Sequence, residues 1–130
     1  SWEVTQVNEL LTQMEAFDGV FICTTNLMDK LDPASLRRFS FKVKFNYLTA
    51  DQRAALFLQQ LERLGGDTTA ADGYCQQVRS LEQLTPGDFA VAARQFELWG
   101  TSATAQKLYE QLAKECGAKG APARKIGFKA

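Results

Sequence analysis

The spacing of apolar residues changes near residue 48, and this change constrains the fold more than any other feature of the sequence. Before that point, runs of apolar and β-branched residues at 20–25 and 41–45 predict strands. After it the strand patterns stop, and four stretches with helical spacing follow, each with its own start signal. We therefore predict an α/β segment over residues 1–48, an all-α domain over 49–117 and a basic, flexible tail over 118–130.

The α/β segment begins with apolar residues at helical spacing over residues 4–17, which predict a helix. The run at 20–25 has the composition of a strand buried on both faces, whereas residues 41–45 alternate between apolar residues and lysine, as in a half-exposed strand. Between them, Asp32 is a good N-cap and Pro33 a good first helical residue. Two strands linked through a helix predict part of a parallel sheet, in a chain that is mostly helical overall.

The four later helices have recognisable ends. Thr49 and Gln52 form a capping box, and Gly65-Gly66 stops that helix. A second helix is predicted over residues 71–82. The third starts at Thr85, Pro86 and Asp88, and the fourth runs from Ser102 to a stop at Gly117. Helical spacing predicts a core made of these residues: Leu56, Phe57, Leu61, Leu64, Tyr74, Val78, Leu81, Phe89, Ala92, Ala93, Phe96, Trp99, Ala105, Leu108, Leu112 and Cys116.

Composition excludes several classes of protein. The sequence contains no histidine, which removes Ser-His-Asp and Cys-His catalysis and H-E-x-x-H metal sites. Its three cysteines are widely spaced without a C-x-x-C pair, so neither a disulfide framework nor a zinc site is expected. Fifteen basic residues balance fifteen acidic ones, so no overall field draws the chain to nucleic acid. With no membrane-length apolar run and no signal-peptide pattern, we expect a cytoplasmic protein that does not contact membranes.

Two neighbouring motifs carry a family resemblance. Ile22-Cys23-Thr24-Thr25-Asn26 is a strand-like run with a polar end, and Leu31-Asp32-Pro33-Ala34-Ser35-Leu36-Arg37-Arg38-Phe39 follows it closely. Together they resemble the sensor-1 and arginine-finger segment of AAA+ ATPases. The match to the AAA pattern is close over Leu31–Ala34. Here the Pro-Gly pair after the first arginine is absent, Ser40 stands where Asp is usual, and Phe41 stands where a second arginine often lies.

The resemblance implies catalytic roles for three residues. Asn26 would orient the attacking water near the terminal phosphate of ATP, with Thr25 as a neighbour in cofactor binding. Arg38 would be the arginine finger and Arg37 a supporting residue. A guanidinium group suits this role because its permanent charge and planar donors can neutralise a transferring phosphoryl group. Taken singly, a Thr-Thr-Asn turn or an Arg-Arg pair at a helix end would need no catalytic explanation.

A third motif resembles the AAA lid. Leu84-Thr85-Pro86-Gly87-Asp88-Phe89 is similar to the start of the lid helix, where a small residue lets the backbone approach the adenosine. The resemblance assigns cofactor binding to Gly87 and Asp88. No arginine lies in this turn, so a sensor-2 arginine is not expected. An ordinary capped helix explains the same residues without a ligand.

The chain carries only part of the machinery that ATP hydrolysis needs. No stretch reads G-x-x-x-x-G-K-[ST], and no apolar run ends in paired acidic residues. The phosphate loop and magnesium site are expected upstream of Ser1. The resemblance thus implies an ATPase that uses ATP and Mg²⁺. It also implies that the intact protein assembles as a homo-oligomeric ring, a hexamer, and remodels a macromolecular substrate such as a protein. The fragment itself should be inactive and hold no cofactor tightly and no metal.

Other interpretations stay open at this stage. A helical module that binds a protein partner and never touches nucleotide would show upstream sequence without a phosphate loop. A nucleic-acid adaptor using the basic tail would show steeply salt-dependent binding. In the AAA+ arrangement the two predicted strands flank a strand that bears the phosphate loop, and this chain lacks that strand. We therefore expect exposed strand edges and self-association.

Overall fold

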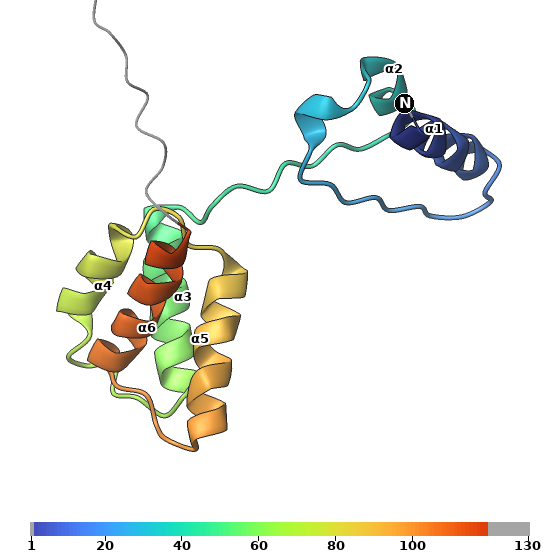
Figure 1. The fold of residues 1–130 in the computed structure, drawn as a ribbon. Helices are drawn as coiled ribbons and strands as arrows, with labels where there is room; N and C mark the ends of the chain where they lie inside the picture. Colours follow the sequence, from blue (N-terminus) through green and yellow to red (C-terminus); the bar gives the residue numbers. More distant parts are fainter. Residues whose placement is uncertain (1, 120–130) are drawn as a thin grey trace, which may run out of the picture. The chain divides into compact units, whose positions relative to one another are not determined.

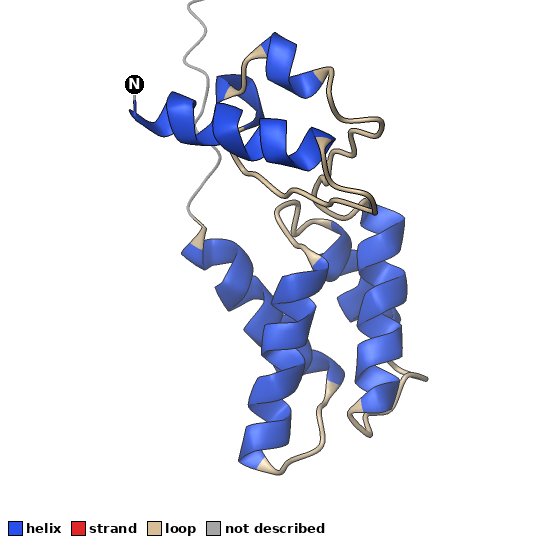
Figure 2. Cartoon of the chain, turned by 90° about the vertical axis from the view of Figure 1, so that its right-hand side faces the viewer, coloured by secondary structure: helices blue, strands red, loops and turns tan. Residues whose placement is uncertain are grey.

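The computed structural model describes residues 2–119, and these divide into two compact units between Lys44 and Phe45 (Figure 1). The junction predicted from the change in apolar spacing lay a few residues later, after residue 48. Every regular element in the described part of the chain is a helix (Figure 2). Each unit is treated separately below.

The first unit contains three helical segments. Helix α1 (Trp2–Glu15) is followed by a long loop, the 3-10 turn η1 (Met28–Lys30) and the short helix α2 (Pro33–Leu36). Asp32 caps α2 by accepting a hydrogen bond at Oδ1 from the backbone N–H of Ala34, at 3.2 Å, so the predicted helix start is confirmed. Buried side chains are few: among residues 5–44 they are Leu11 and Ser35.

The predicted partial parallel sheet was wrong for this chain. Residues 20–25 and 41–45 form no strand, and no ladder joins them within residues 2–119. Their apolar side chains lie in solvent instead: Val20 is 85% and Ile22 is 82% exposed. A strand needs a partner for its backbone N–H and C=O groups, and the described residues supply none for these two segments.

The second unit is a bundle of four helices: α3 (Ala50–Arg63), α4 (Asp72–Arg79), α5 (Pro86–Trp99) and α6 (Ala105–Ala118). Both predicted capping sites are present: Thr49 with Gln52 opens α3, and Thr85 with Asp88 opens α5. The fourth helix differs from the expectation, because its N-cap is Thr104 rather than Ser102 and it continues past Gly117. A glycine weakens a helix by about 1 kcal/mol but does not have to end it.

The bundle holds the hydrophobic core. Helix α3 packs against α4 and α5, and α6 packs against α4 and α5, as Figure 1 shows. Trp99 was placed wrongly in the predicted core: it lies at the end of α5, is 55% exposed, and contacts Phe96 edge-on with ring centroids 5.5 Å apart. The largest fully buried side chains are Phe57, Phe89, Phe96, Leu61, Leu84, Leu108, Leu112 and Val78.

A glycine pair joins α3 to the rest of the bundle. Gly65 adopts a φ of 75°, and its N–H and that of Gly66 donate to the carbonyls of Glu62 and Leu61 at 3.0 and 2.8 Å. The N–H of Ala103 donates to the carbonyl of Leu64 at 3.1 Å, which ties the loop before α6 to the end of α3. The predicted helix stop at Gly65-Gly66 is therefore confirmed.

Residues 120–130, which make up most of the predicted basic tail, lie outside the described residues. Among the helices of residues 2–119, none combines the length and the hydropathy that crossing a bilayer requires.

Candidate functional site

Asn26, the predicted water-orienting residue, lies in the loop before η1 and is exposed. The turn around it is set by Thr25, whose Oγ1 accepts a hydrogen bond from the backbone N–H of Leu27 at 3.0 Å. This local bond is the usual behaviour of a threonine in a turn. The amide of Asn26 therefore faces solvent from a loop rather than from the end of a strand.

Arg37 and Arg38 end the short helix α2. Arg37 is its C-cap residue, and its backbone N–H donates to the carbonyl of Pro33 at 3.2 Å. Nε of Arg38 donates to Oε1 of Glu15 at 3.0 Å, which links the end of α2 to the end of α1. The side chain of Arg38 is 33% exposed and that of Glu15 is 52% exposed. A half-exposed pair of this kind contributes at most about 1 kcal/mol, so the guanidinium group can exchange partners easily.

Gly87 and Asp88 belong to the first turn of α5, in the second unit. Oδ2 of Asp88 accepts hydrogen bonds from the N–H and the Oγ1–H of Thr85, at 2.7 and 2.8 Å, and forms an ion pair with Lys119. Burial raises the pKa of Asp88, but the hydrogen bonds from Lys119 and Thr85 outweigh it and hold this pKa below its ordinary value. The carboxylate of Asp88 thus caps the helix and already has three partners.

Steric crowding within the fold does not require a glycine at position 87. A Cβ added there would meet Oγ1 of Thr85 at 3.5 Å, an ordinary contact. The position is exposed, so a ligand could approach the backbone of α5 at this point.

The structure groups the predicted residues by unit. Thr25, Asn26, Arg37 and Arg38 belong to the first unit, and Gly87 and Asp88 to the second. Among residues 2–119, no hydrogen bond or ion pair connects Asn26 to either arginine. The resemblance to AAA+ ATPases implies that Asn26 acts on the nucleotide of its own subunit and Arg38 on that of a neighbour, and such roles need no direct contact between them.

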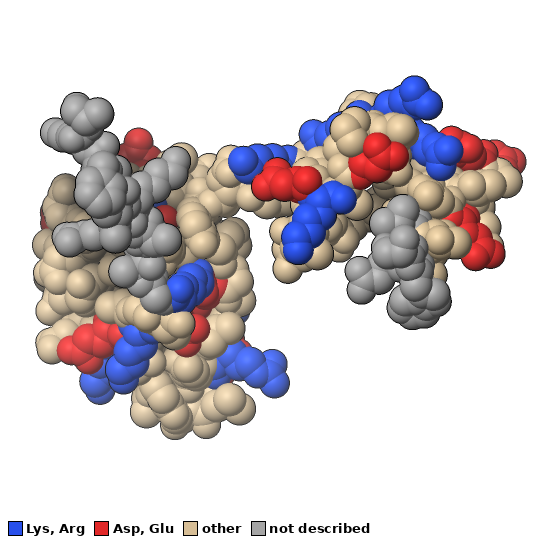
Figure 3. Space-filling view, turned by 45° about the horizontal axis from the view of Figure 1, so that its top comes forward, with Lys and Arg blue, Asp and Glu red and all other residues tan. Residues whose placement is uncertain are grey.

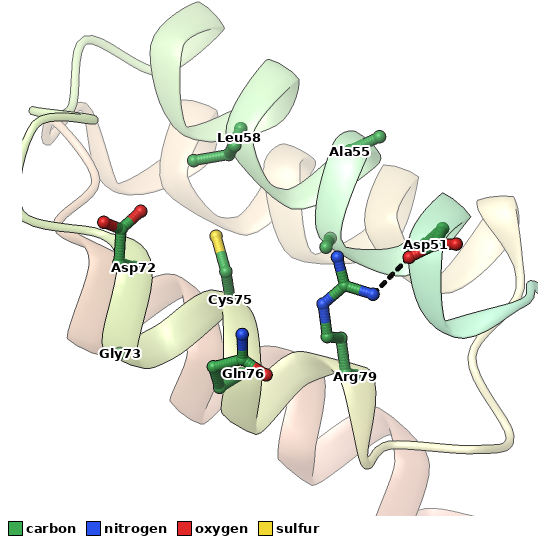
Figure 4. Close-up of a pocket in the computed structure, with 9 residues that line it drawn as sticks. Asp51, Ala55, Leu58, Asp72, Gly73, Cys75, Gln76 and Arg79 are labelled. Atoms are coloured by element: carbon green, nitrogen blue, oxygen red, sulfur yellow. Dashed lines mark hydrogen bonds and ion pairs between the residues drawn. The ribbon is translucent and has the colours of Figure 1, made fainter.

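A groove of about 630 Å³ between α3 and α4 was not anticipated from the sequence (Figure 4). An ion pair between Arg79 and Asp51 lies at one end, and the sulfur of Cys75 points toward α3. Burial raises the pKa of the Cys75 thiol, and the nearby carboxylate of Asp72 adds to this shift. The thiol stays protonated at neutral pH, so it is a poor nucleophile and metal ligand. The spacing of Asp72, Cys75 and Arg79 places them on one helix face, and only the packing of α3 makes that face a groove.

Arg53 is a further residue that sequence reasoning missed. It is 6% exposed, and its guanidinium group donates to the carbonyl oxygens of Leu48 and Arg79, each at 2.5 Å. It therefore connects the start of α3 to the last turn of α4. In the sequence it lies in the first turns of an amphipathic helix and looks like a solvent-facing charge, so no local signal could have identified it.

The described residues offer no metal centre. Among them, no three His, Cys, Asp or Glu side chains come together in a group that could hold an ion. On the face drawn in Figure 3, basic and acidic side chains are interspersed over the parts of the chain that the structure describes. Magnesium prefers carboxylate and water oxygens around a phosphate, and residues 2–119 contribute no such carboxylate set.

Comparison with known proteins finds one family whose model resembles the N-terminal part of the chain. Residues 3–47 match the model of AAA, the ATPase family associated with various cellular activities. No curated protein and no solved structure matches the chain. The matched range contains Thr25, Asn26, Arg37 and Arg38 and stops just before α3. Over residues 3–47, the chain is therefore similar to part of an AAA-type ATPase.

Proposed function

We propose that the chain supplies the sensor-1 residue, the arginine finger and the helical lid of an ATPase that hydrolyses ATP in a cytoplasmic, oligomeric ring. In this proposal the ring is a hexamer and remodels a macromolecular substrate. The match of residues 3–47 to the AAA family supports the ATPase assignment. The four-helix bundle that comes next in the sequence supports the assignment of a lid.

The observation that carries the proposal is the environment of Arg38. It lies in the matched segment, its side chain is 33% exposed, and its one ion pair among the described residues is with the exposed Glu15. Such a pair is weak enough to be exchanged for a phosphate. A finger arginine acting from a neighbouring subunit raises the rate of phosphoryl transfer by about a thousand- to a hundred-thousand-fold.

The remaining residues take supporting roles. The exposed amide of Asn26 can orient a water, with the turn held by Thr25. Arg37, exposed at the end of α2, adds positive charge beside Arg38. Gly87 leaves the backbone of α5 open to an adenosine, and Asp88 holds that turn in place through its capping bonds.

This division of roles predicts that the chain alone does not turn over ATP. Among its described residues no three ligating side chains come together to hold Mg²⁺, and its sequence has no phosphate loop. ATP with Mg²⁺ would be held by those missing parts, and the chain would contribute charge and water positioning. A robust magnesium-dependent rate from the purified chain, unchanged by Arg38→Ala and Asn26→Ala, would contradict the proposal.

The decisive test joins this chain to the phosphate-loop half of its domain and measures steady-state ATP hydrolysis at matched concentration. Arg38→Ala should lower the rate by about a thousand-fold or more. Glu15→Gln breaks the same ion pair but keeps the arginine, so it should leave hydrolysis nearly unchanged. Arg63→Ala removes an exposed arginine paired with Glu97 at 3.2 Å and is the matched control.

Mixing subunits tests whether Arg38 acts between copies. Rings mixed from Arg38→Ala and Asn26→Ala subunits should regain part of the activity, because some interfaces then combine an intact finger with an intact sensor. Equal rates for wild type and Arg38→Ala would instead favour a helical interaction module that does not use nucleotide.

A further inference from the structure

A lysine at the end of α6 reaches the first turn of α5. Nζ of Lys119 donates a hydrogen bond to the carbonyl oxygen of Gln83 at 2.5 Å and forms an ion pair with Oδ2 of Asp88. It also lies 5.4 Å from the centroid of the Tyr47 ring, within the range of a cation–π contact. The end of α6 and the starts of α3 and α5 lie at the same end of the bundle (Figure 1). One ammonium group therefore joins the segment before α3, the start of α5 and the end of α6.

The ion pair between Lys119 and Asp88 is sheltered from solvent. The side chain of Lys119 is 28% exposed and that of Asp88 is 11% exposed, so water and salt screen this pair less than an exposed one. Asp88 also accepts two hydrogen bonds from Thr85, and these cap α5 without the lysine. The start of the helix therefore does not depend on Lys119, whose contacts instead fix where that start lies in the bundle.

The contacts of Lys119 lie close in sequence to Gly87, whose position is exposed and has room around its Cα. A backbone hydrogen bond already ties the segment before α3 to the segment before α5, from the N–H of Leu48 to the carbonyl oxygen of Leu84 at 2.9 Å. The ammonium group of Lys119 adds a second tie between the same two segments. Two ties hold the turn more firmly than the single backbone bond would.

We propose that Lys119 is a positioning residue for nucleotide binding, because its ammonium group holds the turn at Gly87 where an adenosine would contact it. This inference rests on the proposed ATPase function, in which the backbone at Gly87 faces the nucleotide. Lys119 acts through Asp88 and leaves the chemistry at the terminal phosphate to other residues. The first turn of α5 contains no arginine, and a positive charge reaches it from α6 instead.

Loss of this tie should weaken ATP binding and spare the catalytic rate. Lys119→Met removes the charge and the hydrogen bonds of the ammonium group but keeps an unbranched side chain. The turn then has to be ordered when nucleotide binds, and ordering of this kind lowers affinity about two- to tenfold. In the protein that joins this chain to its phosphate-loop half, we therefore expect KM for ATP to rise about two- to tenfold with kcat nearly unchanged.

Three further variants separate positioning from a general loss of stability. Lys114→Met makes the same change at an exposed position on α6 and should match wild type. Lys119→Arg keeps a positive charge and hydrogen-bond donors, so it should retain most of the affinity. In an Asp88→Asn background, Lys119→Met should raise KM by a smaller factor than it does in wild type, because the ion pair is already lost. Calorimetric titration with a non-hydrolysable ATP analogue should give the same order of affinities.

Hydrogen exchange in the chain alone tests the same tie without nucleotide. Lys119→Met should speed exchange of the N–H of Leu48, whose bond to Leu84 opens when the turn moves, whereas the N–H of Phe57 inside α3 should keep its rate. Unchanged exchange at Leu48 would overturn the inference.

The joined protein distinguishes failure of this inference from failure of the proposed function. If the wild-type protein does not hydrolyse ATP, the proposed function is wrong and this inference falls with it. If it hydrolyses ATP in a manner that requires Arg38, but Lys119→Met and Lys114→Met have the same KM, only the role of Lys119 is overturned.

Discussion

Replacing Arg53 with methionine tests a buried tertiary contact between two helices of the bundle. The guanidinium group of Arg53 spans two helix ends, with bonds of 2.5 Å to the carbonyl oxygens of Leu48 and Arg79 and a longer one of 3.5 Å to that of Glu82. The carbonyl of Arg79 belongs to the last residue of α4, where helix carbonyls have no partner of their own. Methionine keeps an unbranched apolar side chain but lacks the guanidinium group, so it removes all three hydrogen bonds.

The expected loss in the free energy of unfolding follows from those hydrogen bonds. A hydrogen bond from a charged donor contributes about 1.5–3 kcal/mol, so the two short bonds together contribute about 3–6 kcal/mol. Nε of Arg53 is buried without a partner among the described residues, which offsets about 1–3 kcal/mol of this gain. We therefore expect Arg53→Met to lower the free energy of unfolding of the second unit by about 3 kcal/mol.

The assay is urea unfolding followed by circular dichroism at neutral pH. A loss of this size should lower the unfolding midpoint by about 1–3 M with the same slope. Arg63→Met is the control, because the side chain of Arg63 is 54% exposed and its pair with Glu97 should contribute less than about 1 kcal/mol. If both variants lost the same small amount, the reasoning about the buried guanidinium group would be refuted.

Three further predictions concern single positions. The pKa of Asp88 is lower in the folded chain than in the unfolded one, so the carboxylate stabilises the fold fully above about pH 4 and this stabilisation is lost as pH falls through the folded pKa. Asp88→Asn should therefore remove this pH dependence of the free energy of unfolding, measured from unfolding curves at several pH values. Gly66→Ala should destabilise the bundle by about 1–3 kcal/mol in the same assay, since its Cβ would lie 2.7 Å from the carbonyl oxygen of Ala103; a neutral effect would mean that the loop can move away. A thiol reagent should label the exposed Cys23 quickly in the native chain and Cys75 only on unfolding, and equal rates would contradict the burial of Cys75.

Most of the bundle was predictable from local signals. The capping residues Thr49 and Thr85 mark the starts of α3 and α5, because a side-chain oxygen is needed where backbone N–H groups lack partners. Helical spacing likewise identified Phe57, Phe89 and Leu108 as buried. Such signals act within one turn of a helix, so they do not depend on the rest of the chain.

The residues of the candidate site remain predictions from the resemblance, and their arrangement could not be predicted from the sequence. The motifs around Asn26 and Arg38 fall within the segment that matches the AAA family. The ion pair between Arg38 and Glu15 could not be foreseen, because those residues are far apart in the sequence. The motif at Gly87 gave no indication that the carboxylate of Asp88 would be held by Lys119.

The two predicted strands show that a local sequence pattern does not decide whether a segment joins a sheet. The composition of residues 20–25 and 41–45 favours extended backbone, and the sequence alone determined that these segments would not be helical. Whether they become strands depends on a neighbour that supplies hydrogen bonds, and that neighbour is a property of the tertiary or quaternary structure. A helix forms its backbone hydrogen bonds within itself, so the sequence alone could determine the helices of the bundle. Three features depend on segments that are distant in the sequence: the sheet, the partners of Arg53 and the groove beside Cys75. Only the tertiary structure decided them.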